Sequence, residues 1–144
     1  MTTIDRRTAL ALGAAATAGA ALPASALASD KAMAGKSVLI TGASSGFGQL
    51  AALLFARSGA QVFATMRNLP RSEADEMRKL AKSASLDITV LELDVLSDAS
   101  VNGAVAEAEK LAGGGIDVLV NNAGIGITGP VEVQDMEATK LIFD

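Results

Sequence analysis

The chain has 144 residues, of which 50% are hydrophobic and 19% charged, and its formal net charge is −4. This composition is typical of one compact globular domain, and the acidic balance offers no basic surface for binding nucleic acid. Cysteine and histidine are both absent, which excludes most zinc, copper and iron–sulfur sites, so we expect no metal.

Residues 1–28 resemble an export signal rather than part of a folded domain. A charged head at 5–7 is followed by an Ala-, Leu- and Gly-rich stretch at about 8–21, and residues 26–28 form an A-x-A cleavage sequence. The sequence DRRTAL resembles a twin-arginine leader, a signal that carries proteins already folded, often with cofactor bound. We therefore expect a signal peptide at 1–28 and a short tether at 29–35, in a periplasmic or otherwise exported protein.

Two other interpretations of this leader stay open, namely an Ala-rich helix of the folded domain and an uncleaved membrane anchor. The apolar stretch is shorter than the roughly 20 residues that span a bilayer. Alanine and glycine also contribute little free energy of insertion. Cleavage after Ala28 is therefore the favoured outcome, and a membrane-anchored protein is the alternative localisation.

From Lys36 onward, short β-rich runs alternate with stretches whose apolar residues recur at helical spacing. The pattern predicts strands at 37–41, 61–66, 88–93 and 116–121, and helices at 46–58, 72–84, 98–112 and from about 135. The strands are nearly continuously apolar, which is typical of strands buried on both faces of a parallel sheet covered by helices. With right-handed crossovers, this α/β pattern predicts a doubly wound parallel sheet.

Apolar spacing also predicts which side of each helix is buried. The residues expected to be buried are Phe47, Leu50, Ala51, Leu54 and Phe55 in the first helix, Met77, Leu80, Ala81 and Ala84 in the second, and Val101, Ala104, Val105, Ala108 and Leu111 in the third. Ser72 with Asp75 resembles a capping box, and Ser97 is placed to cap the third helix. The Ser-Gly pair at 58–59 and the glycines at 113–115 are expected to end the first and third helices.

The segment TGASSGFG at residues 41–48 follows an apolar strand and opens a helix. A strand that ends in a glycine turn before a helix points several backbone N–H groups, and the positive end of the helix dipole, at one place. A phosphate fits there. Ser44 and Ser45 can add hydroxyl hydrogen bonds. Tight turns use glycine for conformational reasons alone, but the position within a βαβ unit favours a phosphate site.

Each glycine of this segment has a separate expected task. Gly42 makes the sharp turn, and Gly46 lets a diphosphate approach the backbone without a Cβ in the way. Gly48 lets the helix pack close to the strand.

The spacing is G-x-x-x-G-x-G, preceded by Thr41 and followed by LDV at 93–95 and DVLVNNAG at 117–124. In this order and at these distances the motifs resemble the short-chain dehydrogenase/reductase family, over essentially all of residues 36–144. The resemblance implies a Rossmann fold whose strand order begins 3-2-1-4 and is incomplete here, and which binds a nicotinamide dinucleotide. In complete members it also implies hydride transfer to or from the carbon of a small-molecule alcohol or carbonyl compound.

The resemblance also assigns roles by position. Asp94 would hydrogen-bond the adenine amino group while Val95 packs on the ring, although an aspartate here is also a candidate helix cap. Asn121, Ala123 and Gly124 would shape the cofactor pocket behind the fourth strand. For Asn121, a purely structural role in tying the sheet together is equally open.

The turn after the second strand selects the coenzyme, because an acid there binds a free ribose 2′-hydroxyl whereas arginine accommodates a 2′-phosphate. The segment FATMRNLPR contains no acid, and Arg67, with Arg71 as a second candidate, is placed to pair with the phosphate. The ATxR sequence also resembles NADP-preferring family members, so we expect NADP rather than NAD; a solvated surface arginine is the alternative. The candidate cofactor-binding residues are Gly42, Ser44, Ser45, Gly46, Phe47, Gly48, Arg67, Asp94, Val95, Asn121, Ala123 and Gly124.

The absence of tyrosine bears on catalysis. Complete family members carry a catalytic Asn, a Ser and a Tyr-x-x-x-Lys pair, whose tyrosine exchanges a proton with the substrate oxygen. No catalytic residue is assigned here, and we expect this chain alone to be inactive. We interpret it as the cofactor-binding part of a longer reductase. In this part alone the apolar strand at 118–120 is an uncovered edge of the sheet. The sequence does not indicate whether a complete protein forms a homo-oligomer.

Other interpretations are a truncated gene product, a dinucleotide-binding or regulatory module without chemistry, and another Rossmann enzyme such as a nucleotide-sugar epimerase or a methyltransferase. The glycine spacing and the NNAG sequence argue against these last two enzymes. The substrate is not indicated, except that SSGFG resembles carbonyl reductases of apolar molecules.

Cleavage of the leader can be checked directly. Because residues 26–28 have the small side chains that a signal peptidase requires, N-terminal sequencing of exported protein is expected to begin at Ser29. Exported protein that still begins at Met1 would contradict this prediction.

Overall fold

The computed structural model describes residues 31–126 and 135–143. The expected signal peptide at 1–28 lies outside these residues. Of the expected tether, the part from residue 31 is described, and it packs on the domain: the Met33 amide donates to the Ser58 carbonyl at 2.9 Å, and the Met33 side chain packs against the core. None of the described helices combines the length and apolar character needed to cross a bilayer.

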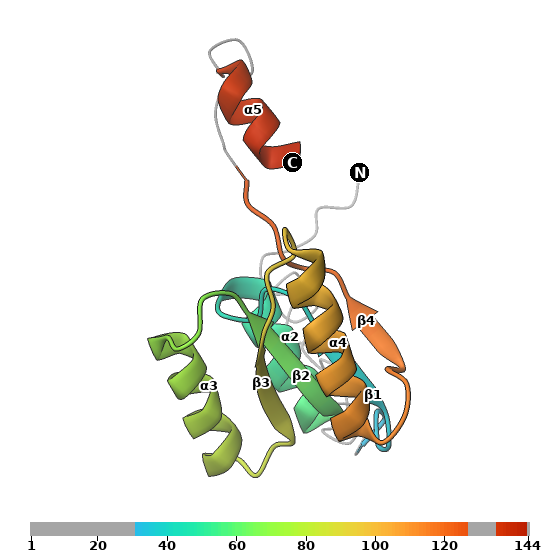
Figure 1. Ribbon diagram of the computed structural model, residues 1–144. Coiled ribbons are helices and arrows are strands. Elements are labelled where there is room, and N and C mark those ends of the chain that lie inside the picture. The colour runs from blue at the N-terminus through green and yellow to red at the C-terminus, as the bar shows by residue number, and fades with distance from the viewer. Residues whose placement is uncertain (1–30, 127–134, 144) are drawn as a thin grey trace, which may run out of the picture. The chain divides into compact units, whose positions relative to one another are not determined.

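The described elements alternate between strand and helix, as expected (Figure 1). They are β1 (Ser37–Ile40), α2 (Gly46–Arg57), β2 (Gln61–Met66), α3 (Ser72–Ser83), β3 (Ile88–Glu92), α4 (Asp98–Ala112), β4 (Val118–Val120) and α5 (Met136–Phe143). The four strands are parallel and lie in the order β3-β2-β1-β4. The prediction of a Rossmann-type sheet with strand order 3-2-1-4 is therefore confirmed.

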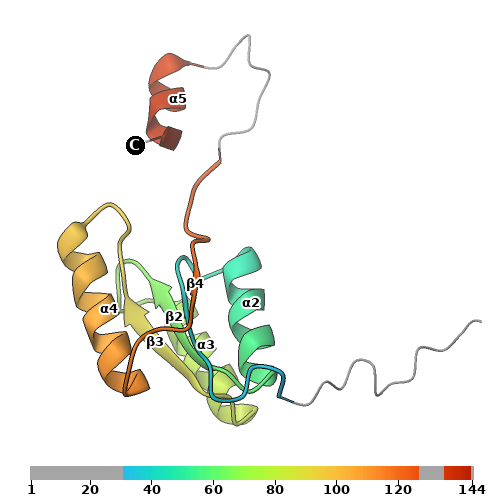
Figure 2. The ribbon, with the colours of Figure 1, turned by 90° about the vertical axis from the view of Figure 1, so that its right-hand side faces the viewer.

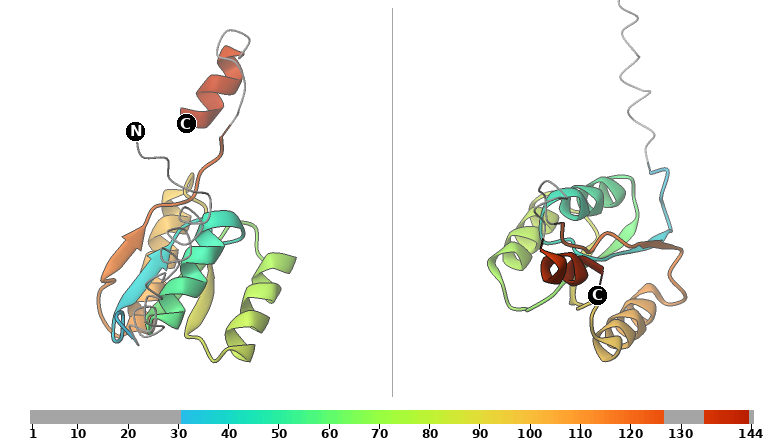
Figure 3. Two further views of the ribbon diagram at one scale, coloured as in Figure 1. Left: turned by 180° about the vertical axis from the view of Figure 1, so that it is seen from behind. Right: turned by 90° about the horizontal axis from the view of Figure 1, so that it is seen from above.

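Helices cover both faces of the sheet, with α2 and α3 on one face and α4 on the other (Figures 2 and 3). Because side chains alternate along a strand, β1 contributes to both cores. Val38 and Ile40 pack with residues of α2 and α3, whereas Leu39 packs with Phe63 of β2 and with Ala104 of α4. Burial on both faces explains why these strands are continuously apolar.

The buried side of α2 differs from the prediction. Gly48, Ala52 and Ala56 are buried against the sheet, whereas three residues of the predicted stripe are exposed. Those three are Phe47 (86% exposed), Leu50 (63%) and Leu54 (63%). Ala51 and Phe55 of that stripe are half-buried and pack against the core, so the prediction is partly confirmed. The small side chains let the helix lie close to the strands, and that close packing turns the buried face away from the one that hydropathy alone indicates.

The two other helices follow the prediction more closely. In α3, Met77 and Ala81 are buried as expected, but Leu80 is exposed. Ala84, just after the helix, was also expected to be buried and is exposed. In α4, Ala104 and Ala108 are buried as expected. Around them Val101 and Val105 are half-buried, and Leu111 is 43% exposed.

The helix ends confirm three predictions and correct one. Helix α2 ends at Arg57, with Ser58 as its C-cap residue and Gly59 at φ of 92°. The Ser97 hydroxyl caps α4 by accepting the Ser100 amide at 3.3 Å, and Gly113, with φ of 71°, ends that helix in the left-handed region. The expected capping box at Ser72 and Asp75 is wrong, because α3 already begins at Ser72 and its N-cap residue is Arg71, whose side chain makes no capping hydrogen bond.

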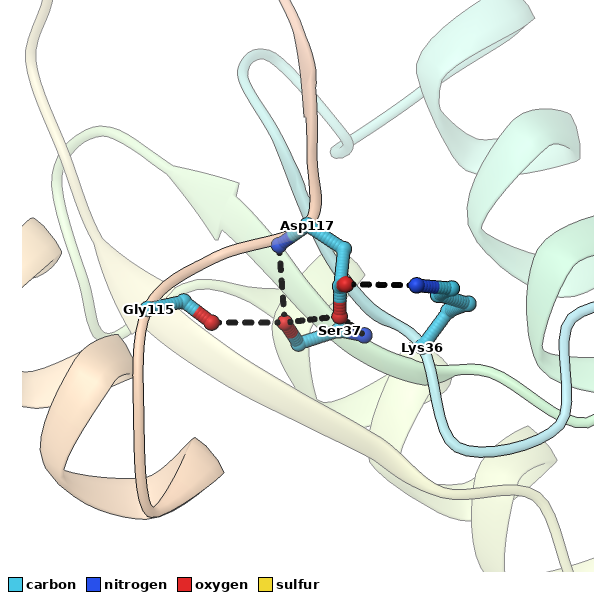
Figure 4. Close-up of polar contacts among 4 residues, drawn as sticks. All are labelled: Lys36, Ser37, Gly115 and Asp117. Atoms are coloured by element: carbon cyan, nitrogen blue, oxygen red, sulfur yellow. Dashed lines mark hydrogen bonds and ion pairs between the residues drawn. The ribbon is translucent and has the colours of Figure 1, made fainter.

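A polar cluster joins the start of β1 to the chain just before β4 (Figure 4). The Asp117 carboxylate accepts from the Lys36 ammonium at 2.8 Å and from the Ser37 amide at 2.9 Å. The Ser37 hydroxyl accepts the Asp117 amide at 3.0 Å and lies 3.1 Å from the Gly115 carbonyl oxygen. The hydrogen bond from Lys36, followed by those from Ser37, lowers the pKa of Asp117 to about 2.

Acid should therefore weaken this cluster. The pKa of Asp117 is about 2 in the folded protein against an ordinary 3.8, so its stabilisation is present above about pH 4 and is lost as the pH falls towards 2. We expect Asp117→Asn to lower the melting temperature at pH 7 and to flatten its decline between about pH 4 and pH 2. Circular dichroism melts at stepped pH values measure both effects.

Asp75→Asn is the matched control for this prediction, because Asp75 is exposed and its carboxylate is bound by Arg78 on the helix surface. Melting curves of Asp117→Asn that keep the native pH dependence would contradict the proposed role of the cluster.

Candidate functional site

The carboxyl ends of the four parallel strands open onto one cavity of about 750 Å³. Segments that follow β1, β2, β3 and β4 all contribute to its lining. In a doubly wound sheet this edge, between the strands where the order reverses, is where ligands bind. Of the candidate residues taken from the sequence, all line the cavity except Gly46, Gly48 and Asn121.

Thr41 joins the end of β1 to the end of β4. This residue is 5% exposed, and its amide donates to the Val120 carbonyl at 3.0 Å. Its hydroxyl oxygen accepts the amides of Asn122 at 3.0 Å and Ala123 at 2.9 Å. The side chain therefore continues the pairing of the two strands beyond their last backbone hydrogen bond.

Asn122 completes this junction from the other strand. Its side-chain amide donates to the carbonyls of Thr41 at 2.9 Å and Gly42 at 3.1 Å. Asn122 lines the cavity, whereas Asn121 is exposed and does not line it. Both roles considered for Asn121, in the pocket and in tying the sheet together, are therefore found at Asn122.

The folded sheet decides between the two asparagines, because side chains alternate along β4 although its sequence is continuously apolar. Val118 and Val120 are half-buried and Leu119 is exposed, so Asn122 continues the inward side of the strand and Asn121 the outward side. The other lining residues that the sequence did not indicate are apolar. Met66 is the last residue of β2, and Leu93, Leu96 and Ile125 follow β3 and β4.

Two glycines are required by the close packing around this junction. Gly42 has φ of +70°, and a Cβ there would lie 2.8 Å from the Ala123 Cα atom. A Cβ on Gly48 would collide with the Gly42 carbonyl oxygen and would lie 2.5 Å from the Asn122 side-chain nitrogen. The turn, the first turn of α2 and the end of β4 thus pack together with no room for a methyl group.

Gly46, the first residue of α2, serves a different purpose. Its φ of +56° favours glycine, yet a Cβ built there would meet nothing within 4 Å. The N-cap residue, Ser45, makes no side-chain capping hydrogen bond, and the first turn of α2 holds no acidic residue. The first amides of a helix lack intrahelical partners, so this end of α2 is suited to binding an anion.

Asp94 lies on the loop between β3 and α4. One carboxylate oxygen accepts the Leu96 amide at 3.1 Å, and the Asp94 amide donates to the Ser100 hydroxyl at 3.0 Å. Since Ser97 caps α4, Asp94 is not its helix cap. The loop holds Asp94 and the half-exposed Val95 together in the cavity lining.

The two arginines after β2 differ in their surroundings. Arg67 lines the cavity and makes no salt bridge within the part of the chain that the structure describes. Arg71 does not line the cavity, and its guanidinium is bound by Glu73, with the shortest contact at 2.6 Å. Arg67 therefore presents an available cation to a ligand, and the expectation that Arg71 shares this role does not fit the structure.

A family model described as short chain dehydrogenase matches residues 36–144 of this chain. Among curated proteins, retinol dehydrogenase 8 of Homo sapiens is 40% identical over 112 residues, which make up 76% of this chain and 34% of that protein. The chain spans between 33% and 42% of the length of such relatives.

Two solved structures share the fold. A gluconate 5-dehydrogenase from Burkholderia cenocepacia, in complex with NADP and tartrate, is 29% identical with a TM-score of 0.65, over 77% of this chain and 42% of that one. An NADPH-bound carbonyl reductase from chicken fatty liver is 32% identical with a TM-score of 0.60, over 75% of this chain and 41% of that one.

The packing around Gly48 predicts a costly substitution. Gly48→Ala should displace the Asn122 side chain and lower the free energy of unfolding by about 1–3 kcal/mol, because the added methyl has no space. Gly103→Ala in α4 is the matched control, since a Cβ there meets nothing within 4 Å, and it should be neutral or stabilise by up to about 1 kcal/mol. Urea unfolding measures both; equal stability of the two variants would contradict the packing argument.

Proposed function

Because the chain belongs to the short-chain dehydrogenase family, we propose that its cavity binds NADP(H) as the coenzyme of an oxidoreductase acting on an alcohol or carbonyl compound. One observation carries the proposal. The glycine turn with the free end of α2, the available Arg67 and the carboxylate of Asp94 converge on a single cavity, although they come from three separate strand ends.

The residues present fit such a coenzyme. A volume of about 750 Å³ falls in the range of small-molecule sites. At the start of α2, Gly46 leaves open space where any other residue would place a Cβ, so a diphosphate could approach the helix amides. Ser44 and Ser45, which also line the cavity, would add hydroxyl donors to that diphosphate.

Residues that follow β2 and β3 would hold the adenosine part. Asp94 would accept a hydrogen bond from the adenine amino group, and Val95 would pack on the adenine ring. Arg67 would bind the ribose 2′-phosphate, since a guanidinium matches the geometry of a phosphate. Ala123 and Gly124 would lie along the coenzyme beside the end of β4. NADP in the gluconate 5-dehydrogenase structure and NADPH in the carbonyl reductase structure support this choice over NAD.

When bound, NADP(H) supplies the hydride donor or acceptor for interconverting an alcohol and a carbonyl compound. The chain's own residues bind and orient the coenzyme and hold apolar side chains such as Leu96 and Ile125 at the cavity. No tyrosine or histidine is present to exchange a proton with a substrate oxygen. We therefore expect this chain alone to bind coenzyme without turnover, and the complete reaction to belong to a longer protein.

A dinucleotide-binding module without chemistry is the second candidate, and the same absence of tyrosine favours it. The two candidates share the coenzyme site and differ only in whether a longer protein carries the catalytic residues. In either case the twin-arginine-like sequence at 5–10 supports export of the folded protein, with its coenzyme bound.

Isothermal titration of the full chain with NADPH and with NADH tests the proposal. Arg67→Asp should weaken NADPH binding by roughly ten- to a hundredfold, the effect of losing a charge-assisted hydrogen bond and adding a repulsive charge, and should alter NADH binding far less. Lys79→Asp makes the same charge change at an exposed residue of α3 outside the cavity lining, and it should preserve NADPH affinity.

Unchanged NADPH affinity in Arg67→Asp would overturn the assignment of the 2′-phosphate site. A native chain that binds neither coenzyme would overturn the proposed function itself.

A further inference from the structure

We propose that Arg71 is a positioning residue for coenzyme choice: its guanidinium, held by Glu73, binds the Arg67 carbonyl and fixes the turn that presents Arg67 to the cavity. This inference rests on the proposed binding of NADP(H). It deepens that function, because it names the contacts that would set the preference for a 2′-phosphate.

The Arg71–Glu73 pair uses two of the three guanidinium nitrogens. Arg71 Nε donates to one carboxylate oxygen at 3.1 Å and Nη2 to the other at 2.6 Å, which is the bidentate geometry of strong Arg–carboxylate pairs. The remaining nitrogen, Nη1, donates to the Arg67 carbonyl at 3.3 Å. Glu73 thus orients the one donor of Arg71 that reaches back across the turn.

The side chains of this pair are less exposed to solvent than those of the other ion pairs of α3 and α4, and they make more hydrogen bonds. The side chains of Arg71 and Glu73 are 28% and 35% exposed, whereas those of Asp75 and Arg78 are 63% and 49% exposed. The Ser72 hydroxyl also donates to Glu73 at 3.0 Å. Hydrogen bonding from Arg71 lowers the pKa of Glu73 from an ordinary 4.5 to about 2, which reflects how strongly the pair stabilises the charged carboxylate.

A second carboxylate holds the same turn from the neighbouring strand. The Glu92 side chain, at the end of β3, accepts the Leu69 amide at 3.3 Å. Between these two anchor points, Asn68 has φ of 58°, a left-handed conformation that asparagine tolerates better than most residues. The turn is therefore tied at residues 67 and 69, on either side of its conformationally unusual residue.

The alternative role for Arg71, as a direct phosphate ligand, makes the opposite prediction for one variant. Glu73→Gln removes a negative charge and releases the guanidinium. If Arg71 binds the phosphate itself, or if only the overall charge matters, NADPH should bind more tightly in this variant. If Arg71 positions Arg67, NADPH should bind more weakly, because the turn loses its orienting contact.

The experiment compares Glu73→Gln and Arg71→Lys with the native chain. Lysine keeps the charge but cannot make a bidentate pair and a third contact together. Asp75→Asn is the matched control, because it removes another carboxylate from the first turn of α3 without touching residues 67–71 through its side chain. Isothermal titration with NADPH and NADH gives the affinities, and circular dichroism melts establish that each variant is folded.

We expect the NADPH dissociation constant to rise roughly three- to tenfold in Glu73→Gln and Arg71→Lys, which corresponds to one lost hydrogen bond. NADH affinity should change by less than about twofold, because NADH has no 2′-phosphate, and Asp75→Asn should match the native chain for both coenzymes. A merely structural role would affect the two coenzymes equally. Tighter NADPH binding in Glu73→Gln, or an unchanged ratio of the two affinities, would overturn the inference.

Hydrogen exchange of the unliganded protein gives an independent readout. The backbone amides at positions 67–69 and 71, on either side of Pro70, should exchange faster in Glu73→Gln and Arg71→Lys than in the native chain, whereas Asp75→Asn should leave them unchanged. Native exchange rates in the first two variants would overturn the inference whatever the coenzyme results. A native chain that binds neither coenzyme would instead overturn the proposed function, and the exchange rates would still decide whether Arg71 holds the turn.

Discussion

The site depends on a close approach between the ends of two neighbouring parallel strands, β1 and β4. The Thr41 hydroxyl and the Asn122 side-chain amide satisfy the backbone groups left over where the two strands separate. Backbone groups left unpaired in this partly buried place would cost free energy, so both side chains stabilise the junction. It also needs glycine at 42 and 48, because a methyl at either position would overlap the opposite strand end or its asparagine.

The amino ends and the carboxyl ends of the strands have separate roles. At the amino ends of β1 and β4, Asp117 collects hydrogen bonds from Lys36 and Ser37 and holds the register of these strands (Figure 4). At the carboxyl ends, residues that follow the strands line a cavity. The polar groups at the amino ends are therefore hydrogen-bonded within the protein, whereas those at the carboxyl ends stay available to a ligand. Open α/β sheets generally bind ligands at the carboxyl ends of their strands.

Positive charge is available to a ligand at two places around the cavity. The positive end of α2 has no acidic side chain in its first turn to neutralise it. Arg67 lines the cavity, whereas the nearby Arg71 is engaged by Glu73. These two neighbouring arginines therefore have different roles, since Arg67 is available to an anion and Arg71 holds the turn. The difference arises because only Arg71 has a carboxylate within reach of a bidentate pair.

The amino-acid sequence by itself determined the strands, the helices and the location of the glycine turn. Apolar periodicity and the glycines at 42, 46 and 48 are local signals, and they act over a few residues. The same local reasoning placed the cap at Ser97, whose partner is three residues away. Family resemblance added the order of the strands within the parallel sheet, which periodicity does not contain.

Tertiary structure decided the face of α2 that is buried, the asparagine that ties the strands, and the arginine that remains available. Periodicity reports the repeat of a helix, but packing distance decides that Ala52 rather than Leu50 faces the sheet. Asn122 is 81 residues from Thr41, and whether it or its neighbour faces inward depends on the register of β4 against β1. Partners so distant in sequence meet only when the sheet has formed, so no local pattern identifies them.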